Sequence, residues 1–118
     1  MREWSCQWRG VHITVQKWTR GFRTGERLLV DGIGIDSDES WIWSPYAYLA
    51  GPVSLLGSRH VIEAIIGQGK GWYRTVCPII VDGYTVGGDR DLPLGVGDLQ
   101  ECAREWAQTR ERGILPFR

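Results

Sequence analysis

A Val-Asp-Gly tripeptide occurs twice in the chain, and each copy lies between two short apolar runs. The copies are Val30-Asp31-Gly32 and Val81-Asp82-Gly83, and they begin 51 positions apart. An Asp-Gly pair between apolar runs is typical of a two-residue β-hairpin turn, because both central residues of that turn need a positive φ angle. We therefore expect two antiparallel hairpins at corresponding places in two similar halves of the chain.

Each Asp-Gly pair follows an alternating apolar segment that carries a histidine. These segments are residues 10–15, with His12, and residues 59–64, with His60, so the two histidines are interpreted as occupying equivalent positions. Alternation with period two places apolar side chains on one face of a strand. Residues 3–9 alternate in the same way and lead into the first segment through a turn.

Further strands are expected over residues 41–48 and 53–56. With no helical pattern between the strands, the predicted fold is mainly β, an antiparallel β-sandwich or flattened barrel of about seven or eight strands. The duplicated β-unit spans residues 3–91, and the chain of 118 residues is expected to be a single domain, residues 1–118.

The C-terminal part of the chain changes to a helical period. We expect a helix over residues 98–113, with Asp98 as its N-cap and Gly113 at its end. Trp106 on its apolar stripe is expected to dock on an edge or face of the sheet. The apolar stripe consists of Leu99, Cys102, Ala103, Trp106 and Ala107.

Composition narrows the classes of function. The 14 basic residues balance the 14 acidic ones, so the chain lacks the long-range field of a general nucleic-acid or membrane-surface binder. No apolar segment resembles a membrane span or a signal peptide. Cys6, Cys77 and Cys102 cannot all pair within one chain, which favours buried thiols and a cytoplasmic location.

Several motifs resemble the Fas apoptotic inhibitory molecule family. In the first half these are Gly10-Val11-His12 and the segment 25–32, which reads Gly-Glu-Arg-Leu-Leu-Val-Asp-Gly; in the second half they are Gly57-Ser58-Arg59-His60 and Ile80-Val81-Asp82. The resemblance covers most of residues 3–86 and implies a compact antiparallel β-sandwich that acts through protein contacts, with no enzymatic site to transfer. This chain has one such unit where the family pairs two, and its C-terminal helix is a further departure, so the apoptotic role is not transferred.

No motif predicts catalysis, a metal site or a cofactor. His12 and His60 are interpreted as surface or hydrogen-bonded residues, with catalysis and a pH-sensitive contact as alternatives. Residues 67–71 lack the spacing of a phosphate-binding loop and are expected to form a hairpin turn. Residues 36–40 are expected to form a solvated acidic loop, with a weak metal site as the alternative. The cysteines lack zinc-ligand spacing, and Cys77 in particular is expected to be buried.

A basic segment with aromatic residues precedes the first Asp-Gly pair. It is interpreted as a solvated hairpin tip, with contact to an acidic protein or to nucleic acid as alternatives. The acidic residues that follow it are expected to weaken its field. Its basic residues are Arg9, Lys17, Arg20, Arg23 and Arg27, with Glu26 as the single acid, and its aromatic residues are Trp18 and Phe22.

The aromatic residues suggest how the protein functions. Trp4, Trp8 and Trp106 are expected in the core, whereas aromatic residues near strand ends suit an interaction patch. We therefore predict a non-catalytic protein-binding or regulatory module, with an unknown protein partner and possible homodimerisation through edge strands. The predicted binding residues are Trp18, Phe22, Arg23, Trp41, Trp43, Trp72 and Tyr73.

The sequence leaves other functions open. One is a small-molecule or lipid site between the sheets lined by Trp41, Trp43 and Trp72. An enzyme that uses His12 or His60 and a nucleic-acid binder are less favoured.

Overall fold

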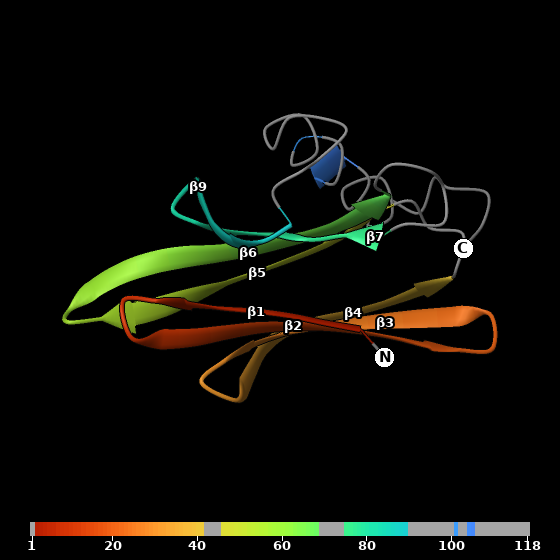
Figure 1. Ribbon diagram of the computed structural model, residues 1–118, viewed down its shortest axis with the longest axis horizontal. Coiled ribbons are helices and arrows are strands. Elements are labelled where there is room, and N and C mark those ends of the chain that lie inside the picture. The colour runs from red at the N-terminus through yellow and green to blue at the C-terminus, as the bar shows by residue number, and fades with distance from the viewer. Residues whose placement is uncertain (1, 42–45, 69–74, 90–100, 102–103, 106–118) are drawn as a thin grey trace.

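The computed structural model describes residues 2–41, 46–68, 75–89, 101, 104 and 105. Their strands form two antiparallel sheets packed face to face, one ordered β1-β2-β3-β4 and the other β5-β6-β8-β9, with β7 paired to β6 (Figure 1). The strands are β1 (Arg2–Trp8), β2 (Val11–Arg20), β3 (Arg23–Val30), β4 (Ile33–Trp41), β5 (Tyr46–Leu55), β6 (Ser58–Gln68), β7 (Thr75–Val76), β8 (Pro78–Val81) and β9 (Tyr84–Gly88).

Four two-residue turns connect the strands at one end of the sandwich (Figure 1). In each turn a non-glycine residue with φ near 50° precedes a glycine with φ between 79° and 86°, the pattern of a type I′ hairpin. The two Asp-Gly hairpins and the Arg9-Gly10 turn are confirmed. The turns are Arg9-Gly10, Asp31-Gly32, Leu56-Gly57 and Asp82-Gly83.

The two Asp-Gly turns make the same backbone contacts, which defines the repeat. The Asp31 N–H donates to the His12 carbonyl at 2.8 Å, and the Asp82 N–H donates to the Val61 carbonyl at 3.0 Å. His12 therefore corresponds to Val61, and His60 lies one residue before the position that is equivalent to His12. The interpretation of the histidines as equivalent is wrong, because a shift of one residue along a strand moves a side chain to the opposite face.

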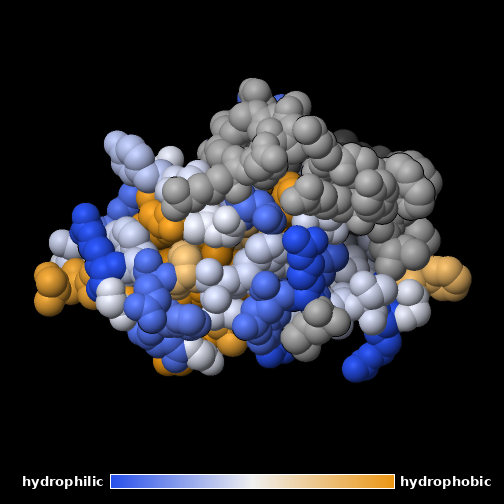
Figure 2. Space-filling view, viewed as in Figure 1, coloured by the Kyte–Doolittle hydropathy of each residue, from blue (hydrophilic) through white to orange (hydrophobic). Residues whose placement is uncertain are grey.

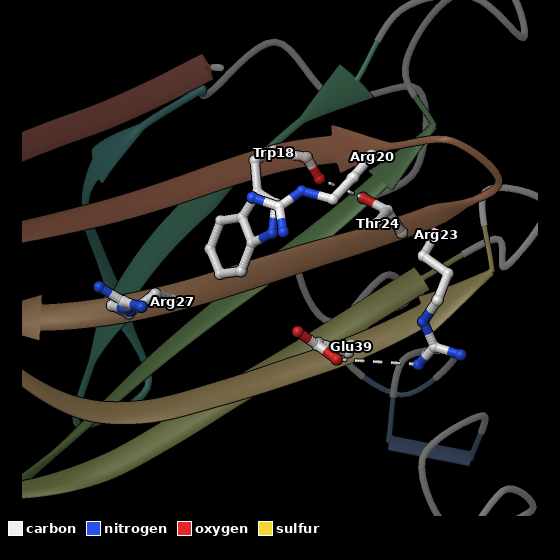
Figure 3. A pocket seen from close by; sticks show the side chains of 6 residues that line it. All are labelled: Trp18, Arg20, Arg23, Thr24, Arg27 and Glu39. Atoms are coloured by element: carbon white, nitrogen blue, oxygen red, sulfur yellow. Dashed lines mark hydrogen bonds and ion pairs between the residues drawn. The ribbon is translucent and has the colours of Figure 1, made fainter.

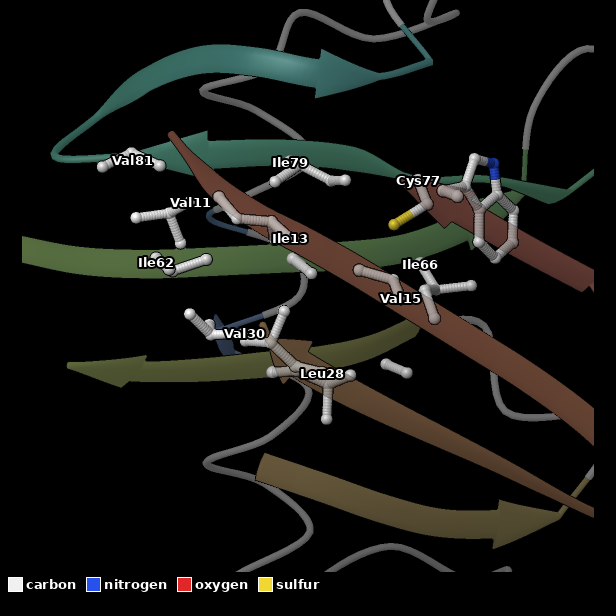
Figure 4. Packing of buried hydrophobic residues seen from close by; sticks show 14 residues of the cluster. Val11, Ile13, Val15, Leu28, Val30, Ile62, Ile66, Cys77, Ile79 and Val81 are labelled. Atoms are coloured by element: carbon white, nitrogen blue, oxygen red, sulfur yellow. The ribbon is translucent and has the colours of Figure 1, made fainter. Parts of the chain in front are cut away.

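The core lies between the sheets and consists of the alternate side chains of both (Figure 4). Ile13 and Ile62, at equivalent positions of the two halves, are both fully buried. Trp4 belongs to this core as expected, and Trp8 packs against it while partly exposed. The labelled aliphatic members are Val11, Ile13, Val15, Leu28, Val30, Ile62, Ile66, Ile79 and Val81.

The long sides of the sandwich are held by contacts between edge strands. On one side the Trp4 indole N–H donates to an Asp89 carboxylate oxygen at 2.8 Å. On the other side the Ala50 N–H donates to an Asp36 carboxylate oxygen at 2.9 Å. The described strands form two sheets and no closed barrel.

The basic segment forms the tip of the β2–β3 hairpin, because the two strands stay paired out to Arg20 and Arg23. Two other expectations about loops are wrong. The acidic residues 36–40 lie in β4, where they pair with β3. Residues 46–55 form one continuous strand, β5, and not two. In each case, pairing with a neighbouring strand outweighs the local polar or turn-forming composition.

The outer face of the five-stranded sheet also buries side chains. Ile65 and Ile80 are fully buried there, and Glu63 accepts hydrogen bonds from Tyr48 and Arg104. Most of the predicted helix, including Cys102 and Trp106, lies outside the described residues. The described part of the chain contains no helix long and apolar enough to cross a membrane.

Candidate functional site

The outer face of the four-stranded sheet carries an open hollow of about 470 Å³ near the β2–β3 turn (Figure 3). Alternation places Val15 and Leu28 toward the core, and it therefore places Trp18 and Arg27 on the opposite, outer face. Hydrophilic side chains dominate the part of the surface where this sheet lies (Figure 2). The hollow is lined by Trp18, Arg20, Arg23, Thr24, Arg27 and Glu39.

Trp18 is seated on a glycine of the neighbouring strand. Trp18 and Gly25 are register partners, and a β-carbon on Gly25 would lie 2.3 Å from the indole Cζ2 atom. The missing side chain thus lets the indole lie against the backbone of β3, as aromatic residues do across strand glycines. The guanidinium carbon of Arg27 lies 5.5 Å from the centre of the indole, within cation–π range.

Arg23 is held at the edge of the hollow by an aromatic ring and a carboxylate. Its guanidinium carbon lies 5.1 Å from the ring centre of Trp41, its register partner on β4. Its Nη2 atom lies 3.8 Å from Glu39 Oε2, with both side chains more than half exposed. An ion pair this long and this exposed contributes little stability, so Glu39 does not fix Arg23 in place.

The hollow has an excess of positive charge. Three arginines and one carboxylate line it. Two further open hollows, of about 310 and 370 Å³, adjoin it and share Arg27. The expected cancellation by the acidic residues of β4 is incomplete, because Asp38 pairs in register with inward-facing Glu26 and thus lies on the other face.

A buried ion pair lies on the inner face of the same strands. Glu26 is 1% exposed and accepts a hydrogen bond from Lys17 Nζ at 3.0 Å. Thr24 Oγ1 bridges the two strands by donating to the Trp18 carbonyl at 3.0 Å. Burial raises the pKa of the Glu26 carboxyl, and Lys17 opposes that shift. The pair ties β2 to β3 directly behind the hollow.

The structure brings together three of the seven predicted binding residues. Trp18 and Arg23 line the hollow, and Trp41 contacts Arg23. Phe22 lies at the turn, is 69% exposed and is not among the lining residues. The other three predicted binding residues, Trp43, Trp72 and Tyr73, lie outside the described residues.

Arg20 and Arg27 belong to the basic segment, for which contact with an acidic protein was an alternative, but the predicted binding residues did not include them. Thr24 and Glu39 were not predicted as binding residues either. A signal for the two arginines of β3 was present in the sequence, because Arg23, Gly25 and Arg27 recur with period two and so share a face. The interpretation of the segment as a solvated hairpin tip concealed this signal, since alternation has meaning only within a strand.

His60 belongs to a second polar cluster, at the end of the sandwich that carries the four turns. Its Nδ1 atom lies 2.5 Å from Asp82 Oδ2, and its ring meets the Trp8 ring edge-on at 4.9 Å. Hydrogen bonds from His60 and from the Val61 N–H lower the pKa of Asp82. The ring contact joins Trp8 of β1 to His60 of β6, so this cluster links the two sheets.

Two of the three cysteines lie in the described part of the chain. Cys77 is buried as expected, and burial raises the pKa of its thiol, which suppresses the reactive thiolate. Cys6 is half-buried, and Cys102 lies outside the described residues. Among the residues with described positions, no group of three or more His, Cys, Asp or Glu side chains could hold a metal ion.

Comparison with known proteins gives no family for this chain. No protein-family model, curated protein or solved structure matches it.

Proposed function

We propose that the protein is a non-catalytic protein-binding module, and that the outer face of its four-stranded sheet binds an acidic segment of a partner. The observation that carries this proposal is that Arg20, Arg23 and Arg27 line one open hollow together with Trp18. Arginines beside aromatic rings are enriched where protein surfaces recognise partners. Protein contact is also what the resemblance to the Fas apoptotic inhibitory molecule family implies.

An acidic protein segment suits this surface better than a nucleic acid does. A base needs an open ring face for stacking, but the Trp18 indole lies against the Gly25 backbone and within range of the Arg27 guanidinium. The net charge of zero also provides no extended basic track for a phosphate backbone. Local arginine donors are sufficient to hold a few carboxylates.

Immobilised peptide pools test this proposal. Beads carrying degenerate nonapeptides with a run of glutamates at the centre should retain the protein at about 0.15 M ionic strength. The triple variant Arg20→Gln/Arg23→Gln/Arg27→Gln should lose retention, because it removes the hollow's guanidinium donors. The control Arg59→Gln changes an exposed arginine of β6 and should bind normally.

Two results would contradict the proposal. In one, the triple variant is retained as well as the unmodified protein, which would move the interface elsewhere. In the other, a single-stranded oligonucleotide binds more tightly than the glutamate pool and depends on the same arginines, which would make the face a nucleic-acid site.

A further inference from the structure

The charge of the hollow matches a doubly charged group better than a single carboxylate. The described residues that line it include three guanidinium groups and the one carboxylate of Glu39, which sum to +2. A phosphorylated side chain carries about −1.5 to −2 near neutral pH, whereas a glutamate carries a single negative charge. A phosphomonoester therefore balances the hollow with one group.

The donors of the hollow are also available. Within the described part of the chain, Arg20 and Arg27 form no ion pair. A cation–π contact such as that between Arg27 and Trp18 uses the face of the guanidinium and leaves the N–H groups at its edge free to donate. The aromatic ring thus limits the positions that the guanidinium can adopt before a ligand arrives.

A phosphate offers the hollow more hydrogen-bond acceptor oxygens than a carboxylate does. A carboxylate has two oxygens, and that of Glu39 reaches Arg23 only at 3.8 Å. A phosphomonoester has three strong acceptor oxygens, so it can accept hydrogen bonds from more than one of the guanidinium groups that line the hollow. The exposed Arg23–Glu39 pair is weak, so a dianion can replace Glu39 as the partner of Arg23.

We propose that the hollow around Trp18 binds a phosphorylated serine or threonine side chain of a protein partner. This inference rests on the proposed function, because it specifies which acidic group the outer face selects. In this proposal Arg20 and Arg27 bind the phosphate directly, and the phosphate replaces Glu39 as the ion-pair partner of Arg23. The flanking peptide lies along the adjoining hollows that share Arg27.

The test compares three immobilised pools of degenerate nonapeptides that differ only at the central residue. That residue is serine, glutamate or phosphoserine, and retention of the folded protein is measured at pH 7 and about 0.15 M ionic strength. We expect at least about tenfold tighter binding to the phosphoserine pool than to the glutamate pool, the effect of one or two added charge-assisted hydrogen bonds. Arg27→Gln and Arg20→Gln should each remove this preference, and Arg59→Gln should keep it.

The possible outcomes separate the two proposals. Equal retention by the glutamate and phosphoserine pools, with a loss in the Arg27→Gln variant, would contradict phosphate recognition and leave the acidic-partner function standing. Retention by none of these three pools would contradict phosphate recognition, and the acidic-partner function would also fail if the pool with a run of glutamates does not retain the protein. A preference for phosphoserine that survives in Arg20→Gln and Arg27→Gln would place the phosphate site outside this hollow. Circular dichroism of each variant, matched to that of the unmodified protein, excludes loss of folding as the cause.

Discussion

Trp18 and Gly25 face each other across β2 and β3, and the indole occupies the space that any side chain on Gly25 would need. This pairing positions the ring that forms one wall of the hollow. It also explains why a glycine lies in the interior of a strand, where it otherwise weakens the sheet.

Gly25→Ala should displace the indole and disrupt the hollow. Because the new β-carbon would overlap the ring, we expect a loss of about 1–3 kcal/mol in the free energy of unfolding, together with weaker binding to acidic peptides. Urea denaturation measures the first effect and peptide-pool retention the second. Gly34→Ala is the matched control for stability, because the nearest neighbour of its new β-carbon would be the Arg27 Cδ atom at 3.8 Å, an ordinary contact. Equal stability of the two variants would contradict this packing.

The repeat can be tested by equivalent core substitutions. Ile13 and Ile62 are both fully buried and occupy corresponding positions beside the two Asp-Gly turns. Ile13→Val and Ile62→Val should therefore each lower the free energy of unfolding by about 0.5–1.5 kcal/mol, with similar values for the two. Val61 is 47% exposed, so Val61→Ala should lower the free energy of unfolding by much less. A negligible cost at only one of the two isoleucines would contradict the equivalence of the two halves.

Sequence patterns predicted the sandwich better than they predicted the site. The Asp-Gly pairs and the alternation of apolar residues revealed the hairpins and the core, because both signals are local. The turn at Leu56-Gly57 carried a weaker signal, since leucine seldom adopts a positive φ. The hollow depends on the pairing of Trp18 with Gly25 and of Arg23 with Trp41, and that register emerges only when strands β2 to β4 are aligned.

Asp82→Asn should lower the free energy of unfolding chiefly at neutral pH. The His60 hydrogen bond is the main cause of the lowered pKa of Asp82. An acid whose pKa is lowered on folding adds stability above its unfolded-state pKa, and this stability is lost as the pH falls through the folded-state pKa. The unmodified protein should thus have a higher free energy of unfolding than Asp82→Asn at pH 7, and this difference should shrink as the pH falls. Urea denaturation between pH 7 and pH 3 measures the difference. A constant advantage would contradict the role of this charge. Asp31→Asn, in the equivalent turn, is the comparison variant.

Glu26→Gln should show the opposite pH dependence. Burial raises the pKa of Glu26, so the folded state binds its proton more tightly than the unfolded state does. Stability then increases as the pH falls through the folded-state pKa, and the gain is complete below the unfolded-state pKa. The unmodified protein should therefore gain stability relative to Glu26→Gln on acidification, in the same denaturation series. Lys17→Met should shift this gain to higher pH, because Lys17 lowers the pKa of Glu26. A relative loss on acidification would contradict the assignment.

We propose that the Trp18 face of the four-stranded sheet is the recognition surface of the protein. An NMR titration of the tryptophan indole N–H signals with the phosphoserine peptide pool tests it most directly, with the Trp18 signal assigned from Trp18→Phe. We predict that the Trp18 signal shifts with peptide concentration, whereas the Trp4 signal stays fixed, since its indole N–H is engaged with Asp89 at 2.8 Å. An unchanged Trp18 signal, while other tryptophan signals shift on binding, would contradict the claim.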